Sequence, residues 1–248
     1  MTEKRFNTLF NAFILIGMTV VLLLITAYKL QTAESGKALL IVAAVGSLCG
    51  ILSTVCSANG KILTFLFGFF DVAIYGAMCL LGSKYGNAAL HLLYFLPMQF
   101  IGFFQWRRRG AGASGEKPKA RRLTPRQRIL WGIIFLVALV AVYFILLAFD
   151  QNEAASVVKV AVLMDAFSTV CNILGQLLLS TAYMEQWYFW IGVNISTIIM
   201  WGVTLAGGGD SAYATIYIVK YAFYLVNSLN GLRIWYNLSR EDTVPSAS

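Results

Sequence analysis

The chain has 248 residues, of which 59% are hydrophobic and only 12% are charged, and its formal net charge is +8. A soluble protein of this size carries about twice that charged fraction. The composition therefore excludes a soluble domain and predicts an integral membrane protein. No polar stretch between the apolar runs exceeds about twenty residues, which is too short for a nucleotide-binding domain. The chain also lacks a GxxxxGK[ST] motif, so it is not an ATP-driven pump on its own.

Apolar runs of about 20 residues, each long enough to cross a bilayer as a helix, predict an all-α membrane protein. The first run is longer than the 7–15 apolar residues of a signal peptide, so we expect it to be retained. We expect eight transmembrane helices, approximately at 9–28, 38–57, 62–81, 87–106, 129–149, 157–181, 187–206 and 212–236.

The basic residues predict the orientation of these helices. In an eight-span topology fourteen of the nineteen Lys and Arg fall on one side and four on the other, with Lys220 inside a span. Because basic loops stay on the cytoplasmic side, both termini are expected to be cytoplasmic in a multi-pass membrane protein. Nine of the basic residues lie in segment 107–128. That segment is expected to contact anionic lipid heads of the bilayer, and no nucleic-acid partner is expected.

Glycine and tryptophan landmarks recur in the same order in the two halves of the chain. The G-x-x-x-W pattern of Gly102-Trp106 returns at Gly231-Trp235, and two further glycine pairs have nearly the same offset. An internal duplication follows, with a 1+3+1+3 arrangement of two parallel three-helix repeats and a linker helix. The expected parts are an extra helix (1–37), the first repeat (38–106), a basic loop with connector helix (107–156), the second repeat (157–236) and a tail (237–248). Parallel repeats around a central site are a carrier architecture.

One stretch of the second half carries the strongest site signal. At 100° per residue Trp187, Trp190 and Asn194 fall on one face of a membrane helix. Tryptophan often anchors a helix at the membrane interface, and that reading suits Trp187 about as well as a binding role. It does not explain the deeper Asn194. The alternative is an aromatic platform with a hydrogen-bonding partner, suited to a flat polar or cationic small molecule.

Charges inside the spans have a structural and a functional reading. Asp165 and Lys220 lie at equal depth, so an ion pair between them is the preferred interpretation, and a proton- or sodium-coupling site is the alternative. Asp71 either lines the substrate path in the first half of the chain, where it would attract a cation, or is a packing partner of a neighbouring helix. His91 is the only histidine, and no metal site or cofactor is expected.

Three motifs, in order along the chain, resemble those of the PnuC family of bacterial nicotinamide riboside transporters. They are the W-x-x-W-x-x-x-N of Trp187–Asn194, the Y-F-x-P-M-Q-x-x-G-x-x-x-W of Tyr94–Trp106 and the Y-x-x-N-x-x-x-G of Tyr224–Gly231. The resemblance implies a fold related to the SWEET transporters. It also implies facilitated diffusion of nicotinamide riboside by alternating access, with net uptake driven by a cytosolic riboside kinase.

The resemblance also implies roles for particular side chains. Trp187 and Trp190 would flank the pyridinium ring, Asn194 or Gln99 would pair with the carboxamide, and Tyr224 and Asn227 would meet the ribose hydroxyls. The mononucleotide is expected to be rejected, because burying unpaired phosphate charge is costly. Relatives in the superfamily carry thiamin or riboflavin, so another aromatic vitamin is the alternative substrate, and an ion-coupled carrier the alternative mechanism. An enzyme is not expected, because the spans lack a nucleophile–base set. The oligomeric state, including a homo-oligomer, stays open.

Overall fold

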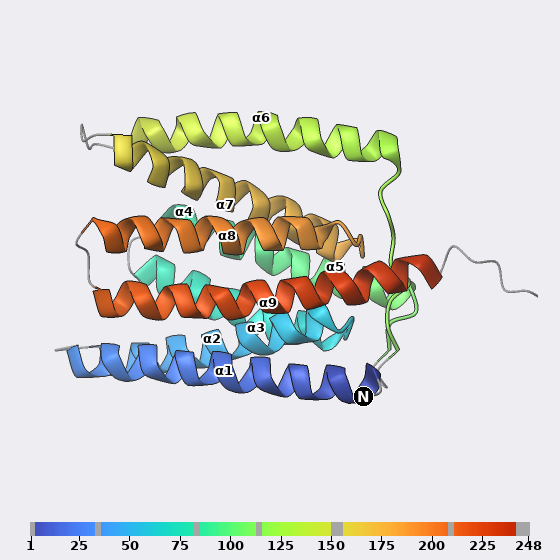
Figure 1. Ribbon diagram of the computed structural model, residues 1–248, viewed down its shortest axis with the longest axis horizontal. Helices are drawn as coiled ribbons and strands as arrows, with labels where there is room; N and C mark the ends of the chain where they lie inside the picture. The colour runs from blue at the N-terminus through green and yellow to red at the C-terminus, as the bar shows by residue number, and fades with distance from the viewer. Residues whose placement is uncertain are drawn as a thin grey trace, which may run out of the picture. The chain divides into compact units, whose positions relative to one another are not determined.

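The structure, a computed structural model, describes residues 3–32, 36–81, 85–112, 116–149, 156–207 and 211–241. Every regular element in these residues is a helix (Figure 1), which confirms the all-α class. A bilayer imposes this choice because a helix satisfies its backbone hydrogen bonds within one segment. The helices are α1 (Glu3–Thr32), α2 (Lys37–Ala58), α3 (Leu63–Leu81), α4 (Tyr85–Ala89), the π-helix η1 (Leu90–Phe95), α5 (Leu96–Arg108), α6 (Pro125–Phe149), α7 (Ser156–Ser180), α8 (Gln186–Ala206) and α9 (Ser211–Glu241).

Each of the eight predicted spans falls on a long helix or, for the fourth, on the continuous series α4–η1–α5. In the described part of the chain six helices are long and apolar enough to cross a membrane. They lie within α1, α2, α3, α4–α5, α6 and α7. The remaining two, α8 and α9, have 21 and 31 residues. At 1.5 Å per residue these are about 31 Å and 46 Å long, enough for a hydrocarbon core of about 30 Å.

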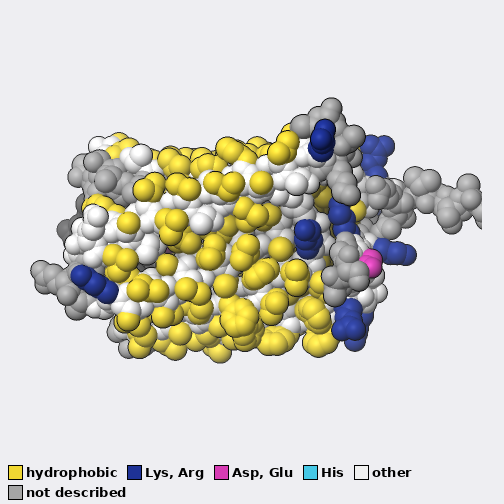
Figure 2. Space-filling model, turned by 90° about the horizontal axis from the view of Figure 1, so that it is seen from below, with side chains coloured by type: hydrophobic (Ala, Val, Ile, Leu, Met, Phe, Trp, Pro, Cys, Tyr) yellow, Lys and Arg dark blue, Asp and Glu magenta, His cyan; other side chains and the backbone are white. Residues whose placement is uncertain are grey.

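Hydrophobic side chains are exposed along the helices, as a lipid-facing surface requires. In α6 no residue between Pro125 and Ala148 is buried, and Leu136 is 60% exposed. Figure 2 shows one face on which hydrophobic side chains cover the middle, while Lys and Arg side chains gather mainly toward one end. This distribution suits a lipid bilayer, which is apolar in the middle and polar at its interfaces.

The chain divides into two compact units, Met1–Lys119 with Ser180–Ala182, and Ala120–Leu179 with Tyr183–Ser248. In the first unit α2 packs between α1 and α3, and α3 packs against η1 and α5. Two reciprocal pairs of hydrogen bonds connect α2 and the residue after it to α1 and to α3. Asn11 and Asn59 exchange amide hydrogen bonds of 3.0 Å. The Ser53 hydroxyl donates to the carbonyl of Thr64 (2.8 Å), and the Thr64 hydroxyl donates to the carbonyl of Ser53 (3.0 Å).

In the second unit α8 is the central helix. It runs beside α9 (Figure 1). It meets α7 at two glycines: a Cβ on Gly192 would lie 3.1 Å from a ring carbon of Phe167, and one on Gly175 would lie 3.2 Å from Cβ of Phe189. Phe135 of α6 contacts both aromatic residues, at ring-centroid distances of 5.4 Å from Phe167 and 6.1 Å from Phe189. Small residues on one helix thus receive large ones from the next, as is usual between membrane helices.

Candidate functional site

Trp187 lies in the first turn of α8 and is 2% exposed. Its indole packs on Gly231 of α9, where a Cβ would lie only 2.5 Å from Cη2 of the ring. Only glycine leaves room for the indole at this distance. The indole Nε1 is buried without a hydrogen-bond acceptor among the described residues. Trp187 therefore joins α8 to α9 and still has an indole N–H without an acceptor.

Trp190, one turn further along α8, is half-buried and faces a different neighbour. A Cβ on Gly175 of α7 would lie 3.3 Å from Cε2 of its indole. The sequence places the two tryptophans on one helix face, and the structure shows that their rings lie against different helices. Trp190 has the more accessible ring, whereas the ring of Trp187 is buried against α9.

Asn194 is 5% exposed, and its Nδ2 donates to Oγ of Ser228 in α9 over 3.0 Å. Asn227, the neighbour of Ser228, is fully buried. Sequence reasoning did not single out Ser228. Its position is i+4 from Tyr224 and one residue after Asn227, on the helix face that also carries Gly231. The spacing of Ser228 from Tyr224 and Gly231 is the sequence signal that could have identified it as a site residue.

Tyr224 is half-buried on α9, and Lys220 lies one turn before it. The Lys220 ammonium lies over three tyrosine rings of its own helix, 5.4 Å from the centroid of Tyr217, 5.7 Å from Tyr221 and 5.5 Å from Tyr224. Cation–π contacts of this kind stabilise a charge in an apolar setting by about 0.5–2 kcal/mol. Asp165 of α7 is exposed. Its ion pair with Lys220 remains a prediction.

Gln99 and Asp71 belong to the first unit. Gln99 is buried, its Nε2 donates to the carbonyl of Phe95 over 3.0 Å, and its Oε1 packs against the position of Gly68 in α3. The carboxylate of Asp71 packs on α2, where a Cβ on Gly50 would lie 2.9 Å from it. Both polar side chains are therefore seated on glycines of neighbouring helices.

Glu185 is a further residue to which the sequence assigned no role. It is buried immediately before α8, and its Oε1 is 3.2 Å from Nη2 of Arg128. The partners are 57 residues apart, and no short-range pattern brings them together.

Among the described residues no group of three His, Cys, Asp or Glu is placed to hold a metal ion.

Comparisons with known proteins agree with the motifs. A family model described as nicotinamide mononucleotide transporter matches residues 40–237. The chain is 34% identical over 201 residues to the nicotinamide riboside transporter PnuC of Neisseria mucosa, covering 79% of this chain and 72% of that one. It is 30% identical over 209 residues to the protein of that name from Haemophilus influenzae, covering 84% and 82%.

The fold is also similar to a solved one. A crystal structure of a vitamin B3 transporter PnuC matches with a TM-score of 0.66 and 30% identity, covering 97% of this chain and 94% of the other. All of these relatives are named as transporters, in agreement with the expectation that the chain is not an enzyme. Similarity over this much of the chain, together with the helical fold, shows that the chain belongs to the PnuC family of membrane transporters.

Proposed function

We propose that this transporter carries nicotinamide riboside across the bacterial inner membrane. The observation that carries the proposal is the arrangement of Trp190 and Asn194: a half-buried indole face one turn from a buried carboxamide. The relatives from Neisseria mucosa and Haemophilus influenzae are named for this substrate. Nicotinamide riboside joins a flat pyridinium cation to a carboxamide and a ribose, and each part has a suitable partner on α8 or α9.

Trp190 is the partner proposed for the pyridinium ring. An indole face attracts a desolvated cation by about 2 kcal/mol or more. The ring of Trp190 rests on Gly175 at one edge and remains partly accessible. Trp187 supplies the adjoining wall, and its buried Nε1–H is able to donate to a substrate oxygen.

Asn194 is the partner proposed for the carboxamide. The bond to Ser228 uses one of its amide hydrogens, which leaves Oδ1 and the second hydrogen for a ligand. A carboxamide donates and accepts at once, so two of them pair with complementary hydrogen bonds. Gln99, Tyr224 and Asn227 remain candidates for the carboxamide and the ribose hydroxyls. Asp71, Asp165 and Lys220 remain candidates for gating or charge pairing.

The proposed mechanism is facilitated diffusion by alternating access, with both termini in the cytoplasm. Phosphorylation of the riboside by a cytosolic kinase would remove the free substrate and drive net uptake. The kinase is a functional partner and need not bind the transporter. The domain division predicted from the sequence, with repeats at 38–106 and 157–236, supplies the moving parts of this proposal.

The mononucleotide is the second candidate, because the matching family model is described by that substrate. A phosphate adds about two negative charges at neutral pH. Gly175, which lies against Trp190, and Ser228, which accepts a hydrogen bond from Asn194, are neutral. Burying a phosphate there without a cation would be costly. We therefore expect the riboside to bind and the mononucleotide to be rejected.

Calorimetry on detergent-purified protein tests this function, with nicotinamide riboside, the mononucleotide, thiamin and riboflavin as ligands. We expect riboside binding in the wild type that is lost in Trp190→Ala and in Asn194→Ala. Tyr188→Ala is the matched control, since Tyr188 lies on the same helix but is 55% exposed. Binding of the mononucleotide or thiamin in place of the riboside would identify that compound as the substrate. Binding of none of the ligands would overturn the proposal.

A further inference from the structure

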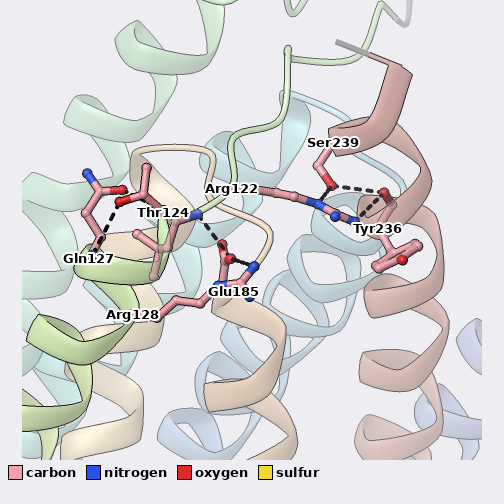
Figure 3. Close-up of polar contacts among 8 residues, drawn as sticks. Arg122, Thr124, Gln127, Arg128, Glu185, Tyr236 and Ser239 are labelled. Carbon is pink, nitrogen blue, oxygen red and sulfur yellow. Dashed lines mark hydrogen bonds and ion pairs between the residues drawn. The ribbon is translucent and has the colours of Figure 1, made fainter. Parts of the chain in front are cut away.

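Glu185 connects the start of α8 to the segment that precedes α6 (Figure 3). Its Oε1 accepts a hydrogen bond from the backbone N–H of Leu123 over 3.0 Å and pairs with Nη2 of Arg128 over 3.2 Å. The side chain of Glu185 is 5% exposed, whereas that of Arg128 is 54% exposed. A buried carboxylate is therefore held by one backbone donor and one cation reaching in from the surface.

This carboxylate does not serve its own helix. Glu185 occupies the position before the first residue of α8, where an acidic side chain usually accepts hydrogen bonds from the first turn. Here its side chain makes no such capping bond. It turns instead toward Leu123, so its interaction fixes α8 against another segment. Burying a carboxylate away from water is costly, and the ion pair with Arg128 offsets part of this cost.

The segment Arg121–Thr124, called the clasp below, also holds other parts of the second unit. The backbone N–H of Met184 donates to the carbonyl of Arg121 over 2.9 Å, one residue before Glu185. Arg122 reaches the far end of α9, where its Nε donates to Oγ of Ser239 over 2.7 Å (Figure 3). The clasp thus connects the beginning of α8 to the end of α9. These two helices carry the Trp187–Gly231 and Asn194–Ser228 contacts.

We propose that Glu185 is a positioning residue of the substrate site, acting through α8 on the two tryptophans. One residue separates it from Trp187, and Trp190 follows one turn later on the same stiff helix. Because Trp187 is already in close contact with Gly231, a small shift of the first turn changes both indole positions. A binding site must hold its side chains within about 0.5 Å of the productive geometry, so such a shift weakens the site. The effect on substrate binding rests on the function proposed above, but the effect on the tryptophans does not.

The test compares Arg128→Gln, Glu185→Gln and the double variant, with Arg126→Gln as the matched control. Arg126 is an exposed cation two residues from Arg128, so its loss reproduces the change in charge. Arg128→Gln leaves a charged carboxylate buried on the Leu123 N–H alone and is expected to weaken riboside binding about tenfold. Glu185→Gln keeps an acceptor for Leu123. The double variant is therefore expected to recover affinity to within about twofold of wild type.

Fluorotryptophan NMR supplies a readout that needs no ligand. The chain has six tryptophans, and Trp187→Phe and Trp190→Phe assign their two resonances. We expect both resonances to shift from their wild-type positions in Arg128→Gln and to return to those positions in the double variant. In Arg126→Gln they should remain at the wild-type positions. Unshifted resonances with a lower melting temperature would overturn the proposal and leave Glu185 with a purely stabilising role. Shifted resonances in a protein that binds no riboside would support the positioning and refute the proposed substrate.

Discussion

At the scale of single residues, the contact between Gly231 and Trp187 determines how closely α8 approaches α9 and gives a direct prediction. In Gly231→Ala the new Cβ would lie 2.5–2.7 Å from three carbons of the indole, so the ring must move. Overpacking of this kind costs about 1–3 kcal/mol in stability. We expect a lower melting temperature together with weaker riboside binding by calorimetry. Gly202→Ala in α8 is the control, because a Cβ there meets nothing within 4 Å. Equal effects in the two variants would contradict the role of this contact.

The sequence predicted several of these residues but not their contacts. Helical periodicity indicated that Trp187, Trp190 and Asn194 share a face, because that depends on spacing within one helix. It did not show that Trp187 is buried on Gly231 while Trp190 lies on Gly175. The rotation of a helix against its neighbours is set by packing across helices. The bond between Leu123 and Glu185 joins residues 62 positions apart, beyond any local pattern.

At the scale of helices, apolar runs predicted the transmembrane elements well, since the bilayer requires about 20 apolar residues per crossing. The structure extends some helices beyond those runs: α1 begins at Glu3, and α9 continues to Glu241. Backbone hydrogen bonding continues into the polar interface, where hydropathy gives no signal. The π-helix Leu90–Phe95 was also not predicted, because hydropathy does not distinguish it from ordinary α-helix.

Pro97 accounts for the wide turn of this π-helix and provides the second prediction. Proline lacks an N–H and clashes with the carbonyl four residues earlier, and a wider turn relieves that clash. The N–H of Leu96 accordingly bonds the carbonyl of His91, five residues back. We expect Pro97→Ala to favour ordinary α-helix, raising the melting temperature and slowing riboside uptake into liposomes. Leu93→Ala, at a 77% exposed position in the same turn, should change neither quantity. Unchanged uptake in Pro97→Ala would show that the wide turn has no part in transport.

At the scale of the whole molecule, the division into two compact units falls in the basic loop, after Lys119. The connector helix α6 lies in the second unit with the helices of the tryptophan motif. The glycine and tryptophan offsets in the sequence predict a duplication, because close helix contacts require small residues at equivalent places in each copy. A repeat pattern does not predict loop contacts such as those of the clasp, since these contacts join residues from segments far apart in the sequence.

The charge of the proposed substrate gives a last prediction for the complete transporter. Nicotinamide riboside carries one positive charge, so facilitated diffusion moves that charge across the membrane with the substrate. A potential of 100 mV is worth about 2.3 kcal/mol per charge, so an interior-negative potential of about 60 mV should concentrate the riboside about tenfold inside liposomes. A potassium gradient with valinomycin sets this potential, and liposomes containing Trp190→Ala measure leakage. A pH gradient alone should produce no accumulation in this mechanism. Accumulation driven by the pH gradient at zero potential would instead identify a proton-coupled carrier, and Asp165 would then be the first residue to substitute.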